Sequence, residues 1–129
     1  MNSSKFLKAL NLQSNTTPPV WFMRQAGRYL PEYQEIRKNY TNFLDMCKQP
    51  ETCAELALQP IDRYGLDASI LFSDILTIPD AFNLGLAFHE GEGPKFSNPI
   101  SSAEDINHLD AFDVNALDYV FKAVEETKK

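Results

Sequence analysis

The sequence predicts an α/β fold in which buried parallel strands alternate with helices. Two short, mostly apolar runs predict the strands: residues 20–23, directly after two prolines, and residues 68–73. Such runs are typical of strands that are covered on both faces of a parallel sheet. The chain between them has helical periodicity. Strands separated by helices are joined by a right-handed crossover, which places their carboxyl ends at the same edge of the sheet.

Helical patterns begin before the first strand and resume after it. Residues 4–12 predict a short amphipathic helix, and residues 13–19 predict a polar linker. After the first strand, Pro31 suits the first position of a helix, with Glu32 in its first turn. One face of this helix carries three apolar or aromatic residues and one cation: Tyr33, Ile36, Arg37 and Tyr40.

Two more helices are expected before the second strand. Residues 41–47 predict a short helix, and a longer one begins at Pro50. We expect Pro60 to kink the longer helix, because proline lacks the backbone N–H, and Gly65 to close it. Its apolar residues recur on one face: Cys53, Leu56, Ala57 and Ile61.

The segment after the second strand predicts a helix and a hairpin. Residues 75–84 predict a helical segment interrupted near Pro79, and residues 86–96 a hairpin with a glycine-rich tip. Gly91-Glu92-Gly93 at this tip predicts a turn rather than a phosphate loop. It lacks the wider glycine spacing and the lysine-hydroxyl ending of such loops, and its glutamate would repel phosphate.

Two helices are predicted near the C-terminus. Residues 101–104, Ser-Ser-Ala-Glu, predict a capping box that opens the first. The second runs to Lys128-Lys129, whose positive charges suit a helix C-terminus. Its apolar face is Leu117, Val120, Phe121 and Val124.

A cationic turn follows the first predicted strand. Arg24 and Arg28 are four positions apart with Gly27 between them. Gly27 has access to backbone angles closed to other residues, so we expect a sharp turn that directs both guanidinium groups to one place. Such a pair suits a small anion with several carboxylates. The alternative is that both arginines form structural ion pairs.

Asp74 ends the second predicted strand as Arg24 ends the first. Ligands of parallel sheets bind outside the carboxyl ends of the strands. The sequence therefore predicts that Arg24, Arg28 and Asp74 converge on one cleft. The alternative is that Asp74 is the N-cap of the segment that follows it.

Composition and charge limit the class of protein. The chain has 129 residues, 43% of them hydrophobic and 12% aromatic, which is typical of a globular domain. A net charge of −6 argues against nucleic acid or an anionic membrane as a partner. The charge is uneven, because residues 19–38 contain four basic and two acidic side chains. An anion site is therefore compatible with this acidic chain.

Cysteine and histidine usage predicts a reduced protein without a metal. Residues 1–10 lack the apolar core of a signal peptide, and no run approaches membrane-spanning length. We therefore expect a cytoplasmic protein in which Cys47 and Cys53 are reduced and packed. His89 and His108 lie far apart, and neither has a cysteine at metal-ligand spacing, so neither a metal nor a cofactor site is expected.

Two motifs resemble those of the uroporphyrinogen decarboxylase family. The first is Met23-Arg-Gln-Ala-Gly-Arg-Tyr-Leu-Pro-Glu-Tyr33, and the second is Leu71-Phe-Ser-Asp-Ile-Leu76. They occur in the family's order, and Leu58-Gln-Pro60 between them also fits. The similarity extends from about Phe6 to the end of the chain.

The resemblance implies the N-terminal part of a (β/α)8 TIM barrel. Such a barrel typically needs about 250 residues. Residues 1–129 are therefore expected to form an incomplete single domain, about two βα units preceded by an N-terminal helix. The resemblance also implies a cytoplasmic homodimer in haem and tetrapyrrole biosynthesis.

The activity implied by the resemblance is cofactor-free decarboxylation. It converts uroporphyrinogen III to coproporphyrinogen III by removing the carboxyl groups of four acetate side chains. The substrate is its own electron sink, because a protonated pyrrole ring accepts the electrons as carbon dioxide leaves and a second proton completes the methyl group. The protein then only positions the substrate and stabilises charge.

The resemblance also implies roles for individual residues. Asp74 is expected to accept hydrogen bonds from the pyrrole N–H groups and to stabilise the ring cation. Arg24 and Arg28 are expected to hold substrate carboxylates, and one of them to help deliver a proton. Further substrate contacts are expected from Gln25, Ala26, Gly27 and Phe43. Alternatively, Gln25 satisfies backbone groups and Phe43 belongs to the core.

Two other functions stay open at this point. One is a related barrel that uses zinc to transfer methyl groups to corrinoid or thiol acceptors. The other is a non-catalytic porphyrin-binding or anion-binding module formed by these residues alone.

Overall fold

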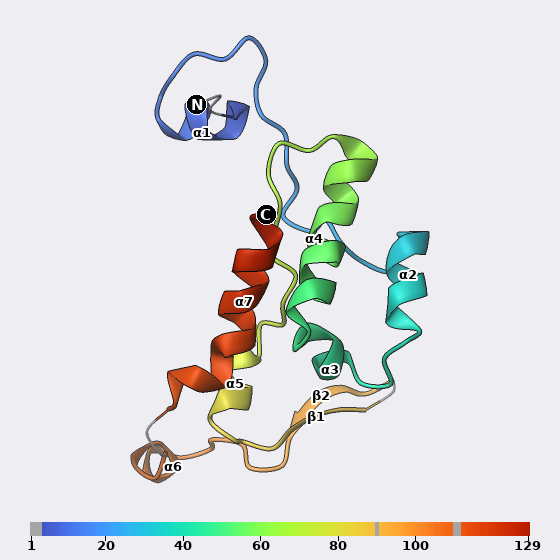
Figure 1. Ribbon diagram of the computed structural model, residues 1–129. Coiled ribbons are helices and arrows are strands. Elements are labelled where there is room, and N and C mark those ends of the chain that lie inside the picture. The colour runs from blue at the N-terminus through green and yellow to red at the C-terminus, as the bar shows by residue number, and fades with distance from the viewer. Residues whose placement is uncertain (1–3, 90, 110–111) are drawn as a thin grey trace.

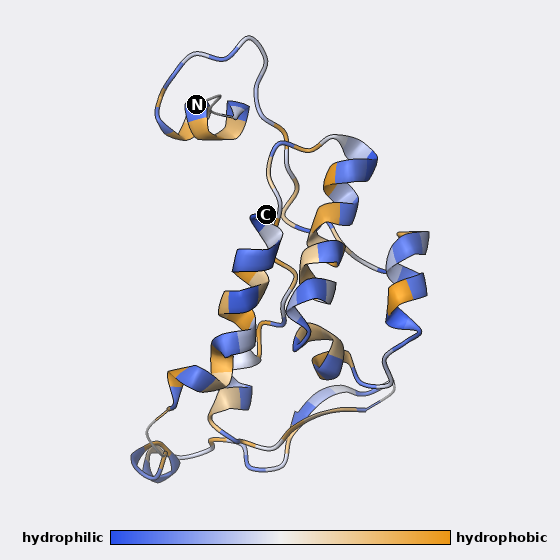
Figure 2. Ribbon diagram, in the orientation of Figure 1, coloured by the Kyte–Doolittle hydropathy of each residue, from blue (hydrophilic) through white to orange (hydrophobic). Residues whose placement is uncertain are grey.

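Two helices, α4 (Pro50–Tyr64) and α7 (Asp118–Thr127), lie side by side at the centre of the structure (Figure 1). The computed structural model describes three stretches of the chain: residues 4–89, 91–109 and 112–129. Helices α2 (Pro31–Arg37) and α3 (Phe43–Cys47) also pack on α4. Polar and apolar residues alternate along α4 and α7 (Figure 2), as expected of amphipathic helices.

Local signals place the ends of the early helices as predicted. Pro31 and Pro50 occupy the first turns of α2 and α4. Gly65 closes α4 in the left-handed conformation with φ of 63°, which costs glycine little. The helix continues through Pro60.

The N-terminal helix α1 (Lys5–Leu10) confirms the first helix prediction but stands apart from the other helices (Figure 1). None of its residues is buried, and Leu10 is 65% exposed. An ion pair of 3.0 Å between Lys5 Nζ and Asp67 Oδ1 connects it to the body of the molecule.

The hairpin is formed as predicted, and the helix before it is shorter than the predicted residues 75–84 but is continuous. Strands β1 (Leu86–His89) and β2 (Gly93–Phe96) pair antiparallel, while Glu90 of the predicted hairpin lies outside the described residues. Helix α5 (Thr77–Ala81) is not interrupted by Pro79. Pro79 is the third residue of α5, where a backbone N–H has no intrahelical partner to lose.

The capping box of α6 (Ala103–Asn107) lies one residue later than predicted. It joins Ser102 and Asp105, not Ser101 and Glu104. The Asp105 carboxylate accepts hydrogen bonds from the backbone N–H groups of Ser101 and Ser102, both at 2.8 Å. A single-turn helix, η1 (Val114–Leu117), then leads into α7.

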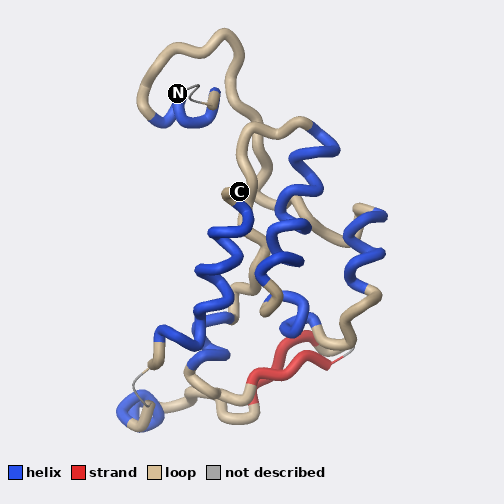
Figure 3. Tube along the Cα trace, in the orientation of Figure 1, coloured by secondary structure: helices blue, strands red, loops and turns tan. Residues whose placement is uncertain are grey.

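The two buried parallel strands predicted at residues 20–23 and 68–73 are not formed, and that prediction was wrong. Among the described residues the strands occur only in the hairpin (Figure 3), so the observed fold is a mixed structure of helices with a two-stranded sheet. A parallel strand needs a ladder of backbone hydrogen bonds. Here one backbone bond in the described chain joins the first run to the residue that precedes the second, from Asp67 N to Val20 O at 2.8 Å. The side chains of the first run are exposed, up to 80% for Met23.

The buried face of α7 also differs from the predicted one. Ala123 is 1% exposed, whereas Phe121 and Val124 are 50% and 41% exposed. Because α7 packs along α4, a small residue such as Ala123 allows the two helices to approach closely. The close approach of α4 therefore explains why the small Ala123 is buried while the larger Phe121 and Val124 are exposed.

A small hydrophobic core lies under the segment that carries the arginines. Its buried members are Leu30, Tyr33, Met46 and Leu56. Partly buried hydrophobic residues packed against it are Ile36, Tyr40, Phe43 and Phe72. The core thus joins α2, α3 and α4 to the segment that leads to Asp74.

Both cysteines are free and buried, as predicted. Burial raises the pKa of Cys47 to about 12 and that of Cys53 to about 11. The thiolate is the reactive form, and its fraction at pH 8 is then roughly 10⁻³ or less. We expect iodoacetamide at pH 8 to leave both thiols of the native protein unmodified and to alkylate both in urea, as measured by intact-mass spectrometry. Rapid double alkylation without urea would contradict this environment.

The same burial predicts the direction of a pH effect on stability. The folded state favours the neutral thiols, so their stabilising contribution is complete below the unfolded pKa of about 8.5. It declines as the pH rises from there towards the folded values of about 11 and about 12. We expect urea midpoints to fall between pH 8 and pH 10 and to fall less in a Cys53→Ala variant.

Candidate active site

The turn after residue 23 carries the predicted cationic groups and is closed by hydrogen bonds. Leu30 N donates to Gly27 O at 3.0 Å, and Gln34 Nε2 donates to Arg28 O at 2.6 Å. Gly27 is not among the glycines with positive φ, and a Cβ there would meet only the Tyr29 ring, at 3.7 Å. The predicted unusual conformation of Gly27 was therefore wrong. The hydrogen bonds, not the glycine backbone, define this turn.

Arg24 and Arg28 both expose their side chains. Neither forms an ion pair with any residue that the structure describes. The alternative that they are structural ion pairs therefore finds no support here. Guanidinium groups that lack carboxylate partners are available to an external anion.

A groove of about 510 Å³ lies beside Arg28. Three of its six lining side chains are cationic, namely Arg28, Arg37 and Lys38. The other three are Tyr33, Gln34 and Tyr40. Lys38 is paired with Glu35 at 2.6 Å, and Arg37 donates to the backbone oxygen of Tyr40. Among the described residues, Arg28 is thus the lining cation whose guanidinium forms no hydrogen bond or ion pair.

Tyr33 and Arg37 are the residues that sequence reasoning missed. Tyr33 is 5% exposed, and burial raises the pKa of its hydroxyl while Arg37 and then Arg28 oppose that rise. The hydroxyl therefore lies in the field of both guanidinium groups. The available signal was the spacing of Arg28, Tyr33 and Arg37 through the turn and the first helix after it, within the basic segment of residues 19–38.

An ion pair fixes α2 beside this groove. Arg63 Nε and Nη2 donate to the two oxygens of Glu32 at 2.7 and 2.8 Å, which lowers the pKa of Glu32. Such two-point contacts set orientation as well as distance. The pair joins the first turn of α2 to the last turn of α4, and so orients the helix that follows the arginine turn.

Gln25 is buried, with an exposure of 4%. Its Nε2 donates to Ala68 O at 2.9 Å, and its Oε1 accepts from Ile70 N at 3.3 Å. The alternative in which Gln25 satisfies backbone groups is the arrangement observed. Ala26 and Gly27 are partly exposed in the same turn.

Asp74 lies in the turn before α5. Its Oδ1 accepts from Leu76 N at 2.7 Å, so the carboxylate stabilises that turn in the manner of the N-cap alternative. No hydrogen bond or ion pair of the described chain joins Asp74 to Arg24 or Arg28. The carboxylate and the guanidinium groups thus occur on neighbouring segments without forming a pair.

An aromatic layer connects the cationic groove to the Asp74 segment. Phe72, two residues before Asp74, lies 5.9 Å from the ring of Tyr33 and 6.2 Å from that of Phe43. Phe43 also lies 5.7 Å from Phe88 of the hairpin. Phe43 is only partly buried, so both its core packing and its predicted substrate contact are compatible with this position.

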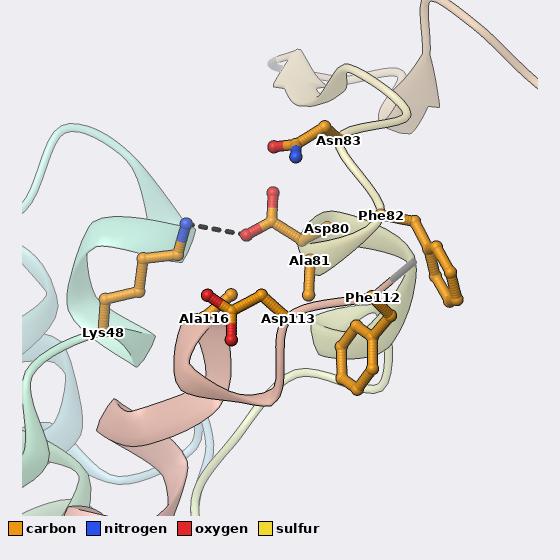
Figure 4. A pocket seen from close by; sticks show the side chains of 8 residues that line it. All are labelled: Lys48, Asp80, Ala81, Phe82, Asn83, Phe112, Asp113 and Ala116. Carbon is orange, nitrogen blue, oxygen red and sulfur yellow. Dashed lines mark ion pairs between the residues drawn. The ribbon is translucent and has the colours of Figure 1, made fainter. Parts of the chain in front are cut away.

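A second hollow, of about 360 Å³, contains none of the predicted site residues (Figure 4). Lys48 Nζ and Asp80 Oδ2 pair across it at 2.7 Å, and the rings of Phe82 and Phe112 lie 5.3 Å apart at its side. The cation and the acid neutralise each other here, which leaves Arg28 and its groove as the better anion site.

Three further observations concern groups outside the groove. His89 and His108 are both exposed. Within residues 4–89, 91–109 and 112–129, no three His, Cys, Asp or Glu side chains gather as metal ligands do. In the same part of the chain, every helix is too short or too polar to cross a membrane.

Comparisons with known proteins give one consistent result. The family model for uroporphyrinogen decarboxylase (URO-D) matches residues 1–129. Curated proteins named uroporphyrinogen decarboxylase are 54% identical over 124 residues in Legionella pneumophila (strain Philadelphia 1), 53% over 129 in Dichelobacter nodosus and 51% over 125 in Francisella philomiragia. The alignments cover 95%, 100% and 95% of this chain, but 35%, 37% and 36% of those relatives. The chain therefore spans little more than a third of the length of the curated relatives it matches.

Proposed function

The chain belongs to the uroporphyrinogen decarboxylase family, and we propose that the protein converts uroporphyrinogen III to coproporphyrinogen III. The observation that carries this proposal is the family match over all 129 residues, which includes the arginine turn and Asp74. The names of the three relatives support it. The substrate is a polycarboxylate, which suits Arg24 and Arg28, because both are exposed and neither pairs with an acidic residue that the structure describes.

In the proposed reaction each acetate side chain loses carbon dioxide and gains a proton. Protonation of the pyrrole carbon beside the acetate makes the ring a cation. The bond between the acetate CH₂ and the carboxylate then breaks, and its electron pair neutralises the ring. A proton added to the exocyclic carbon completes the methyl group, and the ring proton is released. The net change per side chain is one proton consumed and one carbon dioxide formed.

The residues of this chain would position the substrate and stabilise the charge. Asp74 would accept hydrogen bonds from the pyrrole N–H groups and stabilise the ring cation. Arg24 and Arg28 would hold carboxylates, and one of them would assist proton delivery to the reacting acetate. Arg37 and Tyr33 would extend the anion site along the groove. The backbone of Ala26 and Gly27 and the ring of Phe43 would contribute further contacts.

We also propose that residues 1–129 are the N-terminal part of a single (β/α)8 barrel domain that acts without a cofactor as a cytoplasmic homodimer. A barrel of about 250 residues or more agrees with the share of the relatives that is matched. The apolar runs at residues 20–23 and 68–73 support this view, because a completed barrel sheet would pair both and cover the exposed one.

The direct test is incubation of the protein, as its gene encodes it, with uroporphyrinogen III under anaerobic conditions. Coproporphyrinogen III is expected, and it is measured by chromatography after oxidation to the porphyrin. Absence of the product together with stoichiometric zinc would favour the methyltransferase alternative. Tight porphyrin binding without turnover would favour the non-catalytic alternative.

Replacing Arg28 by glutamine is expected to raise the KM for uroporphyrinogen about tenfold. A hydrogen bond to a charged group contributes about 1.5–3 kcal/mol, and this change removes a groove cation that has no ion-pair partner in the described part of the chain. Steady-state kinetics measure it. The matched control is Lys122→Gln, because Lys122 loses the same charge on α7, outside the groove, where it pairs with Asp118 at 2.6 Å. An equal rise of KM in both variants would mean that net charge, not the groove, attracts the substrate.

A further inference from the structure

The side chain of Gln25 makes the hydrogen bonds that a strand peptide would make. In a parallel ladder, the N–H and C=O of one residue bond a carbonyl and an N–H that lie two residues apart on the neighbouring strand. Gln25 bonds Ala68 O at 2.9 Å and Ile70 N at 3.3 Å in this pattern. A side-chain amide has the donor and acceptor of a peptide group. Gln25 therefore takes the place of a missing ladder peptide.

A second side chain completes the pairing at the other end of the same segments. Asp67 N donates to Val20 O at 2.8 Å, and Val20 N donates to Asp67 Oδ2 at 2.9 Å. Residue 20 thus lies beside residue 67, and residue 25 beside residues 68–70. The two segments run in the same direction, and polar groups of Asp67 and Gln25 hold them together. These bonds lower the pKa of Asp67, chiefly through Val20 and then through Lys5.

We propose that Gln25 is a positioning residue, which holds the arginine turn in register with the segment that leads to Asp74. Arg24 is the residue next to Gln25 in the sequence. Ile70, which donates to the Gln25 side chain, is four residues before Asp74. A register slip of two residues would move the arginines by about 6.6 Å relative to Asp74. Displacements of even 1 Å cost catalytic sites about 10²-fold in rate. The inference rests on the proposed function only where it identifies Arg24, Arg28 and Asp74 as the groups that must be positioned.

Gln25→Glu tests this assignment, because the two protonation states of the glutamate side chain differ in the hydrogen bonds that they can form. The neutral acid donates to Ala68 O and accepts from Ile70 N, as the amide does. The carboxylate only accepts: it could still accept from Ile70 N, but its second oxygen faces the carbonyl oxygen of Ala68, and we expect this repulsion to displace the side chain from both partners. Folding therefore favours the protonated form and raises the pKa of this carboxyl above its usual value of about 4.3. The pairing is present at low pH and is lost as the pH rises through the raised pKa.

The expected result is a pH-dependent loss of hydrogen-exchange protection at the backbone amide of Ile70. In the substrate-free Q25E protein, the hydrogen-exchange protection factor of the Ile70 amide should be about tenfold below wild type at pH 8. It should return to the wild-type value at pH 5. The decarboxylation rate relative to wild type should recover over the same pH range.

Two variants separate this effect from others. Gln25→Met has a similar shape but no donor or acceptor, so Ile70 protection should fall about tenfold at both pH values. It also provides the test if Q25E does not fold at pH 8. Gln13→Glu makes the same charge change on an exposed residue and should change neither readout. The other ionisable groups along the paired segments are present in every variant: Arg24, Arg28, Tyr29, Asp67 and Asp74.

Each outcome decides the assignment. Unchanged Ile70 protection in Q25E and Q25M overturns it, and a raised KM with that protection intact makes Gln25 a substrate contact instead. Full activity despite lost protection overturns the positioning role. If the wild-type protein does not decarboxylate uroporphyrinogen, the proposed function fails. Ile70 protection then still decides whether Gln25 holds the two segments together.

Discussion

Asp74→Asn is expected to lower the kcat for uroporphyrinogen decarboxylation by about 10²–10³-fold. Removing one preorganised electrostatic group that faces a developing charge has costs of this size. Asparagine keeps an Oδ1 that accepts from Leu76 N, now 2.7 Å away, so the turn before α5 is retained. The change removes the negative charge and replaces the acceptor Oδ2 by an amide donor. The measurement is the rate of coproporphyrinogen formation at saturating substrate.

Asp113→Asn is the matched control for this change. Asp113 Oδ1 accepts from Asn115 N at 2.9 Å, which is the same turn geometry at a place outside the arginine groove. Its activity should equal that of the wild type. A D74N protein with an undiminished rate would show that Asp74 acts only on its own turn, and the proposed role in cation stabilisation would have to be abandoned.

Leu56→Ala is expected to lower the free energy of unfolding by about 2–5 kcal/mol, the usual range for truncating a buried leucine. Leu56 is 0% exposed and packs in the core cluster with Leu30, Tyr33 and Met46. The cavity left on α4 would have well-packed neighbours on several sides, which limits its collapse. Urea unfolding followed by circular dichroism measures the loss.

Leu58→Ala provides the comparison on the same helix. Leu58 is 37% exposed, so its truncation should cost less than about 1 kcal/mol. The change in helix propensity is identical in the two variants. A similar loss at both positions would therefore indicate that α4, and not the core cluster, determines the stability.

Helices and turns were predictable because their signals are local. A proline at the start of α2 and of α4 and a glycine at the end of α4 act through their own backbone geometry. The hairpin follows from glycines that tolerate positive φ at Gly91 and Gly93. The shifted capping box of α6 shows the limit of such signals, because Asp105 and Glu104 differ only in side-chain length and position.

The parallel strands were not predictable in this way, because a strand is completed by residues far away in the sequence. The apolar run at residues 20–23 has strand-like composition, but its ladder contains one backbone bond to residue 67 in the described chain. The face of α7 was missed for a related reason. Its burial depends on how closely α4 approaches, and periodicity contains no information on that distance.

The candidate site was predictable where it is encoded in contiguous motifs. Arg24, Arg28 and Asp74 come from two such motifs, and their roles remain predictions. Arg37 and Tyr33 belong to the groove only because α2 folds back beside the arginine turn. The hydrogen bonds of Gln25 depend on partners more than forty positions away, so sequence reasoning could only leave its two interpretations open.

The pairing of Val20 with Asp67 has a consequence for how the chain is made. The two residues are 47 positions apart, and ribosomes add about 5–20 residues per second. The apolar segment Val20–Met23 therefore emerges roughly 2 to 9 seconds before its partner exists. During that interval the backbone N–H and C=O of Val20 lack the partners that Asp67 later provides. Slower translation between these codons would lengthen the interval.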